Sequence, residues 1–233
     1  MKKAIMRMAC FITYYRFQVI NKTKIIGAEN FQKLPIKNVL IISNHQTYFA
    51  DVALMVHAIG NALNGNPNRI TIKDFFFRPF LGFYFVAAKE TMKANLLTKI
   101  FALVGSISIQ RTWRSEGKDI NRAVDKNDTQ NIEKALSDGW VITFPQGTTT
   151  PYAQGRKGTA HIIKNYQPIV IPVVVDGFRR AFDKKGLKIK KKGVELKLKV
   201  KEPLDIDFNA SVDDIMEQIM DAIEQSEKYQ FRF

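Results

Sequence analysis

The strongest constraint on the fold is a series of short apolar segments with helical patterns between them. Residues 38–43 (NVLIIS), 140–144 (WVITF) and 169–175 (IVIPVVV) are rich in β-branched side chains and end in polar residues, which is typical of buried strands. Helical spacing occupies 128–138 and 158–164. Because strands that alternate with helices form sheets covered on both faces, the sequence predicts an α/β fold with a central, mostly buried β-sheet flanked by helices.

Further periodic segments complete this single domain, which is predicted to span 1–233. The other expected elements are a buried helix over 52–59, strands over 69–72 and 106–110, a helix over 93–104, and a C-terminal helix from Val212 to about Lys228 that is capped by Ser211. The chain shows no linker and no internal repeat in its sequence.

The most apolar stretch, residues 75–88 (FFFRPFLGFYFVAA), contains seven aromatic residues and one charge, Arg78. Such a density belongs either in a core or on a surface that meets a membrane. Pro79 and Gly82 argue against one long straight helix. We therefore predict a broken helical or re-entrant segment that lies in the membrane interface.

The N-terminal segment, residues 1–35, is predicted to be helical and to face a membrane. Its beginning is basic, no small-residue cleavage site follows, and no window is long and apolar enough to span a bilayer. Helical spacing gathers apolar residues on one face between Arg7 and Arg16, namely Met8, Phe11, Ile12, Tyr15 and Val19. This pattern predicts an interfacial helix, and a helix packed on its own domain is the alternative.

The charge balance favours a polyanionic partner. The chain has 36 Lys and Arg against 22 Asp and Glu, a formal net charge of +14. Nucleic acid and anionic lipid headgroups both fit this charge. The lysine-rich run over 184–201 contains the alternating pattern VELKLKV without interleaved aromatic residues, which favours a solvated strand or a lipid-facing patch over a nucleic-acid site. Residues 177–233 are accordingly predicted to form a basic edge strand and the C-terminal helix.

Cysteine and histidine usage narrows the chemistry. Cys10 is the single cysteine, so no internal disulfide can form, which agrees with a reducing compartment. One cysteine and three histidines at these spacings exclude a zinc cluster. His57 and His161 lie in helical stretches without a matching acid and are interpreted as structural.

The most specific polar feature is the sequence Ser-Asn-His-Gln-Thr that directly follows the strand over 38–43. His45 stands at this strand-to-helix corner, and Asp51 follows it at short range. A carboxylate beside a histidine can fix its tautomer and stabilise the imidazolium, which is the equipment of a general base. A histidine and aspartate at this spacing are also compatible with a helix cap or a satisfied buried pair.

Two further segments bring anion-binding groups to strand ends. Residues 105–111 place Arg111 at the end of a strand, where a guanidinium can bind phosphate in a bidentate manner. Residues 144–150 (FPQGTTT) run from a strand into a turn around Gly147 and Thr148 whose backbone amides can face an anion. Each segment alone is equally explained by a surface charge or a plain turn.

Together and in this order, the segments resemble the glycerolipid acyltransferase superfamily, which includes the 1-acylglycerol-3-phosphate acyltransferases. That superfamily carries an Asn-His-Gln-Ser-like block ending in Asp, a Gly-x-x-x-Ile-x-Arg block, a Phe-Pro-Glu-Gly-Thr-Arg-Ser block and an Ile/Val-Pro-Val strand. The corresponding residues here are 44–51, 105–111, 144–150 and 171–173. The resemblance makes residues 38–176 the motif-bearing core.

The sequence departs from the superfamily pattern in two blocks. Five residues, rather than the usual four, separate His45 from Asp51 in the first block, and on an ideal helix this rotates the Asp51 side chain by about 100°. A bulge or a later helix start must therefore restore the contact. In the third block Gln146 replaces Glu and Thr149 replaces Arg, so two charges are missing, and the downstream Arg156 and Lys157 can partly supply the positive charge.

The resemblance implies acyl transfer from acyl-CoA or acyl carrier protein to a lysolipid hydroxyl, most simply from 1-acylglycerol-3-phosphate to phosphatidic acid. His45 and Asp51 would be the catalytic pair, and Arg111, Gln146, Gly147, Thr148 and Arg156 would bind substrate. No metal or cofactor is implied beyond the thioester co-substrate. The expected location is the cytoplasmic face of the cell membrane, with peripheral or monotopic attachment to an anionic surface and no nucleic-acid partner.

Three other functions remain open on the sequence. The missing charges of the third block fit an enzyme that acylates another lysolipid, such as a lyso-aminolipid. The altered spacing before Asp51 fits a non-catalytic relative that binds membranes. The net charge of +14 by itself also fits a nucleic-acid-binding protein.

Overall fold

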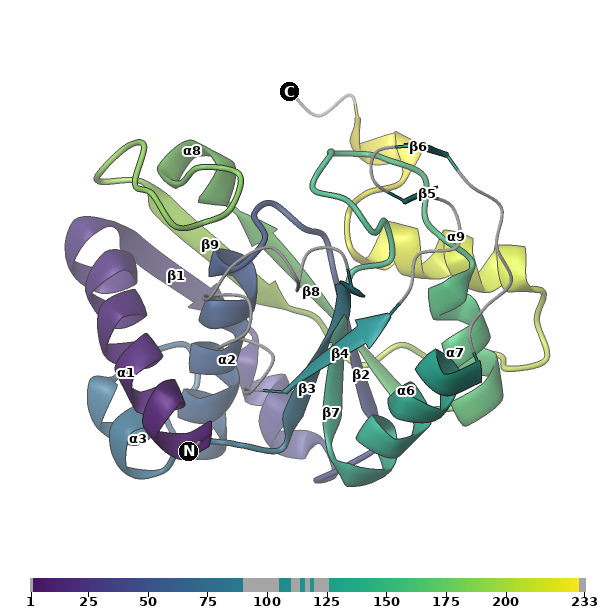
Figure 1. The fold of residues 1–233 in the computed structure, drawn as a ribbon, viewed down its shortest axis with the longest axis horizontal. Helices are drawn as coiled ribbons and strands as arrows, with labels where there is room; N and C mark the ends of the chain where they lie inside the picture. Colours follow the sequence, from purple (N-terminus) through teal and green to yellow (C-terminus); the bar gives the residue numbers. More distant parts are fainter. Residues whose placement is uncertain (1, 90–104, 110–113, 116–117, 120–125, 231–233) are drawn as a thin grey trace.

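A seven-stranded sheet forms the centre of the computed structural model (Figure 1). The structure describes residues 2–89, 105–109, 114–115, 118–119 and 126–230. The strands of the central sheet are β1 (Lys22–Ile26), β2 (Val39–Ser43), β3 (Phe83–Ala88), β4 (Ser106–Ile109), β7 (Trp140–Thr143), β8 (Ile169–Asp176) and β9 (Glu195–Val200). A separate pair consists of β5 (Arg114–Ser115) and β6 (Lys118–Asp119).

Helices cover both faces of the central sheet. The α-helices are α1 (Lys2–Tyr14), α2 (Ala50–Leu63), α3 (Ile72–Phe77), α6 (Lys126–Asp138), α7 (Gly158–Tyr166), α8 (Phe178–Ala181) and α9 (Val212–Ala222). A π-helix, η1 (Tyr15–Ile20), continues α1, and two 3₁₀ helices are η2 (Ala28–Lys33) and η3 (Glu227–Tyr229). The predicted α/β architecture is confirmed, including the strands at 39–43, 140–143 and 169–176 and the helices at 126–138 and 158–166.

The strand order places three loops at one edge of the sheet. The order is β1-β9-β8-β2-β7-β3-β4, so β2 lies between β7 and β8 and runs parallel to both. Val39 is level with Trp140 of β7 and with Ile169 of β8. Because carboxyl ends of parallel strands meet at the same edge, the segments that follow β2, β7 and β8 converge there.

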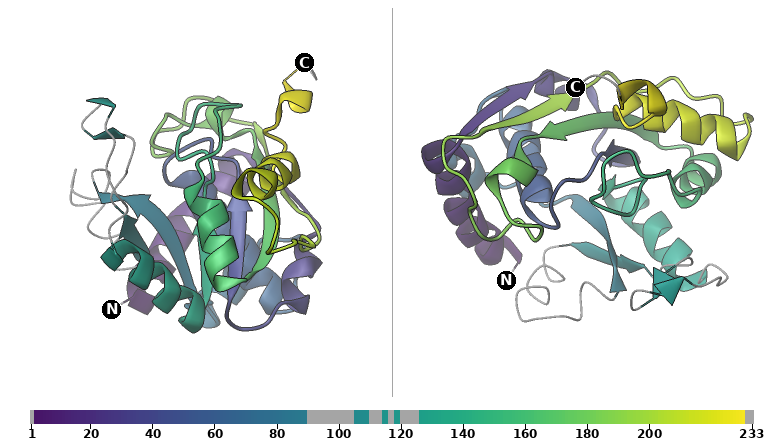
Figure 2. Two further views of the ribbon diagram at one scale, coloured as in Figure 1. Left: turned by 90° about the vertical axis from the view of Figure 1, so that its right-hand side faces the viewer. Right: turned by 90° about the horizontal axis from the view of Figure 1, so that it is seen from above.

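Alternate residues of β2 enter two different cores. Val39 and Ile41 pack with α1 and α2, whereas Leu40 and Ile42 pack with α6, α7 and α9. Seen from above, the purple N-terminal helix and the yellow C-terminal helix lie on opposite sides of the sheet (Figure 2, right). This two-sided burial explains why the strand reads as a continuous apolar run rather than an alternating one.

The aromatic stretch over 75–88 is not one broken helical or re-entrant segment as predicted. Its second half is β3, which pairs in parallel with β7 on one side and with β4 on the other. Phe83 and Phe85 are therefore buried in the core. Its first half ends α3, where Phe76 and Phe77 are exposed. The aromatic residues of the second half thus belong to the core, and those at the end of α3 lie on the surface.

The strand predicted over 69–72 is also wrong. Thr71 instead caps α3, because its hydroxyl oxygen accepts a hydrogen bond from the backbone N–H of Asp74. Its own N–H donates to Oδ1 of Asn61 on α2, at 2.7 Å. A capping threonine thus takes the position that the apolar pattern assigned to a strand.

The lysine-rich strand is not at the edge of the sheet. β9 lies between β1, with which it is parallel, and β8, with which it is antiparallel. The outer strand is β1 (KTKII), which the sequence had placed within the helical segment 1–35. Lys197 and Lys199 face solvent, whereas Leu196 and Leu198 are buried. The alternation therefore indicates a strand with one solvent-exposed face and not a strand at the sheet edge.

The N-terminal helix packs on its own domain on one side and leaves the predicted apolar face exposed on the other. Met6, Cys10 and Phe17 are buried against the domain. On the opposite side, each residue of the predicted apolar face is exposed, namely Met8, Phe11, Ile12, Tyr15 and Val19. Among the described residues, no helix has the length and apolar character that a membrane span requires.

The C-terminal helix begins where predicted and ends earlier. Ser211 and Asp214 form a reciprocal capping box at the start of α9. The helix ends at Ala222 rather than near Lys228, and Glu224 adopts a positive φ of 59° just beyond it. The helix expected over 93–104 lies outside the described residues.

Candidate active site

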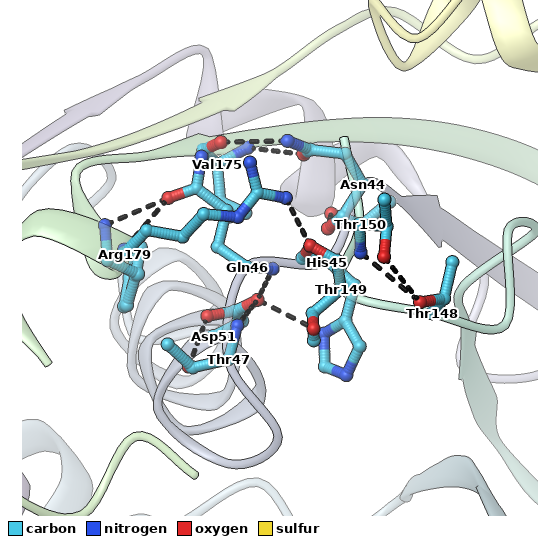
Figure 3. Close-up of polar contacts among 12 residues, drawn as sticks. Asn44, His45, Gln46, Thr47, Asp51, Thr148, Thr149, Thr150, Val175 and Arg179 are labelled. Atoms are coloured by element: carbon cyan, nitrogen blue, oxygen red, sulfur yellow. Dashed lines mark hydrogen bonds and ion pairs between the residues drawn. The ribbon is translucent and has the colours of Figure 1, made fainter. Parts of the chain in front are cut away.

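His45 and Asp51 are in contact at the carboxyl edge of β2. Nδ1 of His45 lies 3.1 Å from Oδ2 of Asp51 (Figure 3). The Asp51 side chain is fully buried, and the His45 side chain keeps 12% of its surface exposed. Because a carboxylate only accepts hydrogen bonds, Nδ1 carries the ring proton. In the neutral tautomer that carries this proton, Nε2 is an acceptor for a substrate proton.

A late helix start compensates for the longer spacing between these two residues. Residues 44–49 are not helical, and α2 begins only at Ala50. The loop instead folds around the carboxylate. The backbone N–H of Thr47 donates to Oδ2 of Asp51 at 3.1 Å, and the Thr47 hydroxyl donates to Oδ1 at 2.7 Å. With the N–H of Gln46 and the ring of His45, four donors satisfy the buried carboxylate.

Phe144 holds the imidazole from its flat side. The ring centroids of His45 and Phe144 are 3.8 Å apart, with an interplanar angle of 24°. Phe144 directly follows β7, so the first and third sequence blocks meet at this stack. The imidazole has little freedom to rotate, because one ring atom is hydrogen-bonded to Asp51 and one ring face packs against Phe144. Such contacts keep a base in one orientation.

The amides on either side of His45 tie the loop to the neighbouring strand β8. The Asn44 side chain exchanges two hydrogen bonds with the backbone of Val175, at 2.9 and 2.8 Å, and so extends the pairing of β2 with β8. Oε1 of Gln46 accepts from the N–H of Phe178 at 2.9 Å and of Arg179 at 3.3 Å. These two residues therefore position His45 through the backbone.

A loop from a distant part of the chain supports the same corner. Tyr48 and Phe49 donate their N–H groups to the carbonyl oxygens of Lys184 and Lys185, each at 3.1 Å. Gly186 has a φ of 78°, and a Cβ there would lie 2.7 Å from the backbone nitrogen of Ala50. Only glycine allows this close approach at a positive φ.

The third block presents a turn to the site but turns Gln146 away from it. Gln146 is buried, and its Nε2 donates to the carbonyl of Ala153 at 3.0 Å and to Oε1 of Gln225 at 3.2 Å. Oε1 of Gln225 also accepts from the N–H of Tyr152. Gln146 therefore holds the loop together and links it to the C-terminal region. Its amide N–H₂ donates these hydrogen bonds, whereas the carboxylate of a Glu at this position could only accept.

Free backbone donors lie one and two residues beyond the predicted glycine. Gly147, with a φ of 62°, uses its own N–H in a turn to the carbonyl of Phe144. The Thr148 hydroxyl pairs with Thr150. Within the described part of the chain, the N–H groups of Thr148 and Thr149 make no hydrogen bond, so they are the donors available to an anion.

The remaining predicted binding residues are less central. Arg156 is exposed, and its backbone N–H donates to the carbonyl of Pro145. Lys157 forms an exposed ion pair with Asp213 at 2.7 Å. Arg111 lies outside the described residues, although β4 of the same block is present.

Arg179 is a residue of the site that the sequence analysis missed. It follows β8 on the short helix α8, and its Nη2 donates to the carbonyl oxygens of His45, at 3.2 Å, and of Thr149 (Figure 3). It thereby connects the first and third blocks. In the sequence, Arg179 could have been noticed as part of a basic pair with Arg180 that directly follows a predicted strand.

The other candidate nucleophiles and ligands lie apart from this site. Burial raises the pKa of the Cys10 thiol far above its usual range, so the thiolate form is disfavoured. His57 is fully buried in α2, and desolvation lowers its pKa from 6.5 to about 3. Among the described residues, no group of His, Cys, Asp and Glu is arranged to hold a metal ion.

Comparisons with known proteins agree with this geometry. The family described as Acyltransferase matches residues 22–176, a range that contains both His45 and Asp51. The crystal structure of the 1-acyl-sn-glycerophosphate (LPA) acyltransferase PlsC from Thermotoga maritima is similar to this chain, with a TM-score of 0.62 and 18% identity over 100% of this chain and 80% of that one. At that identity the likeness concerns the fold. No curated protein sequence matches the chain.

Proposed function

The chain belongs to the acyltransferase family, and on that premise we propose that it acylates the free hydroxyl of 1-acylglycerol-3-phosphate to give phosphatidic acid, a step of phospholipid synthesis. The fatty acyl group would come from a thioester of CoA or of acyl carrier protein. The observation that carries the proposal is the His45 ring, bonded to a buried carboxylate through Nδ1 and partly exposed. Such a ring can act as a general base.

The proposed reaction needs no covalent acyl-enzyme. Nε2 of His45 removes the proton of the acceptor hydroxyl as its oxygen attacks the thioester carbonyl carbon. Asp51 stabilises the imidazolium that forms. When the tetrahedral intermediate collapses, the carbon–sulfur bond breaks and the imidazolium returns the proton to the departing thiolate. A well-placed general base contributes on the order of 10²–10⁴ in rate.

The turn of the third block supports this proposal as a candidate oxyanion site. The N–H groups of Thr148 and Thr149 are available beside the stack of Phe144 on His45. Each correctly placed donor of this kind is worth on the order of 10²–10³ in kcat. They would bind the negative oxygen of the tetrahedral intermediate.

The experiment that tests the activity is product analysis by mass spectrometry. Purified protein is incubated with a panel of lysolipids, each with acyl-CoA and with acyl carrier protein thioester as donor. We expect phosphatidic acid from 1-acylglycerol-3-phosphate with at least one donor. Acylation of a different lysolipid, such as a lyso-aminolipid, would reassign the acceptor, and the absence of any product would support a non-catalytic relative.

We further propose that the protein attaches peripherally or monotopically to the cytoplasmic face of an anionic membrane. An exposed set of side chains from α1, η1 and α3 supports this, and we call it the N-terminal apolar surface: Met8, Phe11, Ile12, Tyr15, Val19, Phe76 and Phe77. Arg7 lies over the Phe76 ring at 5.2 Å from its centroid, which places a cation beside the apolar side chains. Exposed aromatic and basic groups together are typical of interfacial binding.

Vesicle sedimentation tests this attachment. Deletion of the first 20 residues is unsuitable, because Met6, Cys10 and Phe17 belong to the core. A double variant, Phe11→Ser with Ile12→Ser, changes exposed residues only, and Ile36→Ser is the matched control because Ile36 is 82% exposed elsewhere. We expect the double variant to bind anionic vesicles at least about 10-fold more weakly. Equal binding by both variants would place attachment elsewhere.

A further inference from the structure

Arg179 carries a positive charge at the candidate site that its protein contacts do not neutralise. Its half-buried side chain donates from Nη2 to two backbone carbonyl oxygens, those of His45 and Thr149. Within the described residues, no carboxylate forms an ion pair with it, and its Nε and Nη1 groups make no hydrogen bond. A half-buried guanidinium with unused donors is suited to an anionic ligand.

The neighbouring carboxylates are already engaged by other donors. Asp51 accepts from the loop that surrounds it and from His45. Asp176 accepts from Arg180 at 2.9 Å and from Gln46 at 3.4 Å. Burial lowers the pKa of Arg179, an effect that electrostatic interactions with Asp51, Asp176 and Tyr152 oppose. Arginine nevertheless stays protonated in proteins, so the charge is permanent.

The backbone that carries Arg179 is fixed from several directions. Gly177 starts α8 with a φ of 91°, and Oε1 of Gln46 accepts the N–H groups of Phe178 and Arg179. Phe178 is buried and packs edge-on against Phe17, with ring centroids 6.2 Å apart. The guanidinium is thus held in place before any ligand binds, which reduces the entropy lost on binding.

We propose that Arg179 binds a substrate phosphate group next to His45. A guanidinium offers paired N–H donors whose geometry matches two phosphate oxygens. The inference rests on the proposed function, which brings phosphate to this site in the acceptor and, with an acyl-CoA donor, in CoA as well. Thr149 stands where the third block of the superfamily has arginine. Arg179 brings a guanidinium to the carbonyl oxygen of this same residue.

Steady-state kinetics of Arg179→Gln test the assignment, with two substrate comparisons that distinguish the source of the phosphate. One compares 1-acylglycerol-3-phosphate with monoacylglycerol as acceptor, and the other compares acyl-CoA with an acyl-N-acetylcysteamine thioester as donor. We expect KM to rise roughly 10-fold to 100-fold for one phosphate-bearing substrate and to stay unchanged for its phosphate-free counterpart. Arg179→Lys, which keeps the charge, should lie between the two.

Arg180→Gln is the matched control, because Arg180 is the adjacent, exposed arginine and pairs with Asp176 on the surface. It should change neither KM. Calorimetric binding of glycerol 3-phosphate and of CoA to the same proteins gives a readout that does not depend on turnover, and Arg179→Gln should weaken one of the two.

Two results would overturn the inference. One is an equal loss with phosphate-bearing and phosphate-free substrates, which would leave Arg179 with the backbone contacts alone. The other is unchanged binding of both glycerol 3-phosphate and CoA. A wild-type enzyme that acylates only phosphate-free lysolipids would instead refute the proposed acceptor, while the donor comparison and the CoA binding would still decide the role of Arg179.

Discussion

His45 and His57 lie on either side of the first turn of α2, and the two side chains have different surroundings. His45 precedes the helix, keeps part of its surface exposed and contacts the carboxylate of Asp51. His57 lies inside the helix, is fully buried and contacts the hydroxyl of Thr13 through Nε2 at 2.8 Å. Burial next to a neutral partner holds the pKa of His57 at about 3.

The hydrogen-bond partner and the solvent exposure of a histidine, rather than the residue type, therefore decide whether it is suited to transfer protons. A carboxylate supports the charged form of a ring that takes up a proton. A neutral hydroxyl beside a fully buried ring does not, and desolvation then keeps the ring neutral. His57 instead connects α1 with α2 and packs edge-on against Phe17 at 6.0 Å between ring centroids.

Replacing each histidine separately gives the largest expected contrast. His45→Ala should lower the rate of acyl transfer by about 10²–10⁴-fold, because a general base acts in the transition state. His57→Gln should retain most of the activity, since the ring does not reach the site. The measurement is the initial rate with the acceptor that mass spectrometry identifies, on protein whose folding is checked by circular dichroism. Near wild-type turnover by His45→Ala would exclude the general-base mechanism.

Replacing the partner of His45 should have the next largest effect. Asp51→Asn leaves an amide that cannot stabilise the imidazolium by charge, so we expect kcat to fall by at least about 10²-fold. The amide also places an N–H₂ group among four donors, which should cost roughly 1–3 kcal/mol in the free energy of unfolding. Urea denaturation separates the two effects. Loss of stability with unchanged kcat would reduce Asp51 to a structural role.

The pH dependence of stability tests the environment of His57. Its folded-state pKa of about 3 is below the ordinary 6.5, so below pH 6.5 the unfolded chain binds a proton that the folded chain does not. The free energy of unfolding should therefore fall by about 1.4 kcal/mol per pH unit between pH 6.5 and 3, with no contribution above pH 6.5. Comparing urea denaturation of wild type and His57→Gln across this range isolates the effect. Parallel profiles would show that His57 titrates normally.

The smallest expected effect concerns the partner of His57. Thr13→Val removes the hydroxyl that contacts Nε2 and leaves a buried polar atom without that bond, which should cost roughly 1–3 kcal/mol in the free energy of unfolding. Unlike Asp51→Asn, it should leave kcat unchanged. A large fall in kcat would mean that the interface of α1 and α2 controls the site, and the contrast between the two histidines would no longer hold.

Local patterns predicted the main strands and the contact of His45 with Asp51. The segment NVLIIS forms β2 because its residues supply both cores, and Ser211 caps α9 through a contact three residues away. The pairing of His45 with Asp51 also depends on neighbours in sequence. From the sequence, the contact required a bulge or a late helix start, and in the structure α2 begins only at Ala50.

Long-range pairing explains where the predictions failed. The aromatic residues of β3 are buried because β7 and β4 lie on either side of that strand. The lysine-rich β9 is an inner strand because β1, far away in sequence, pairs with its outer side. Neither partner can be identified from the hydrophobicity of the strand itself.

The sequence by itself determined the fold class, the histidine and aspartate of the site and the apolar face of the N-terminal helix, because each depends on residue types repeated or paired over a few positions. The tertiary structure alone decided the strand order, the inward direction of Gln146 and the approach of Arg179 to His45. These depend on which strand ends meet, and that is set by burying both faces of the whole sheet at once.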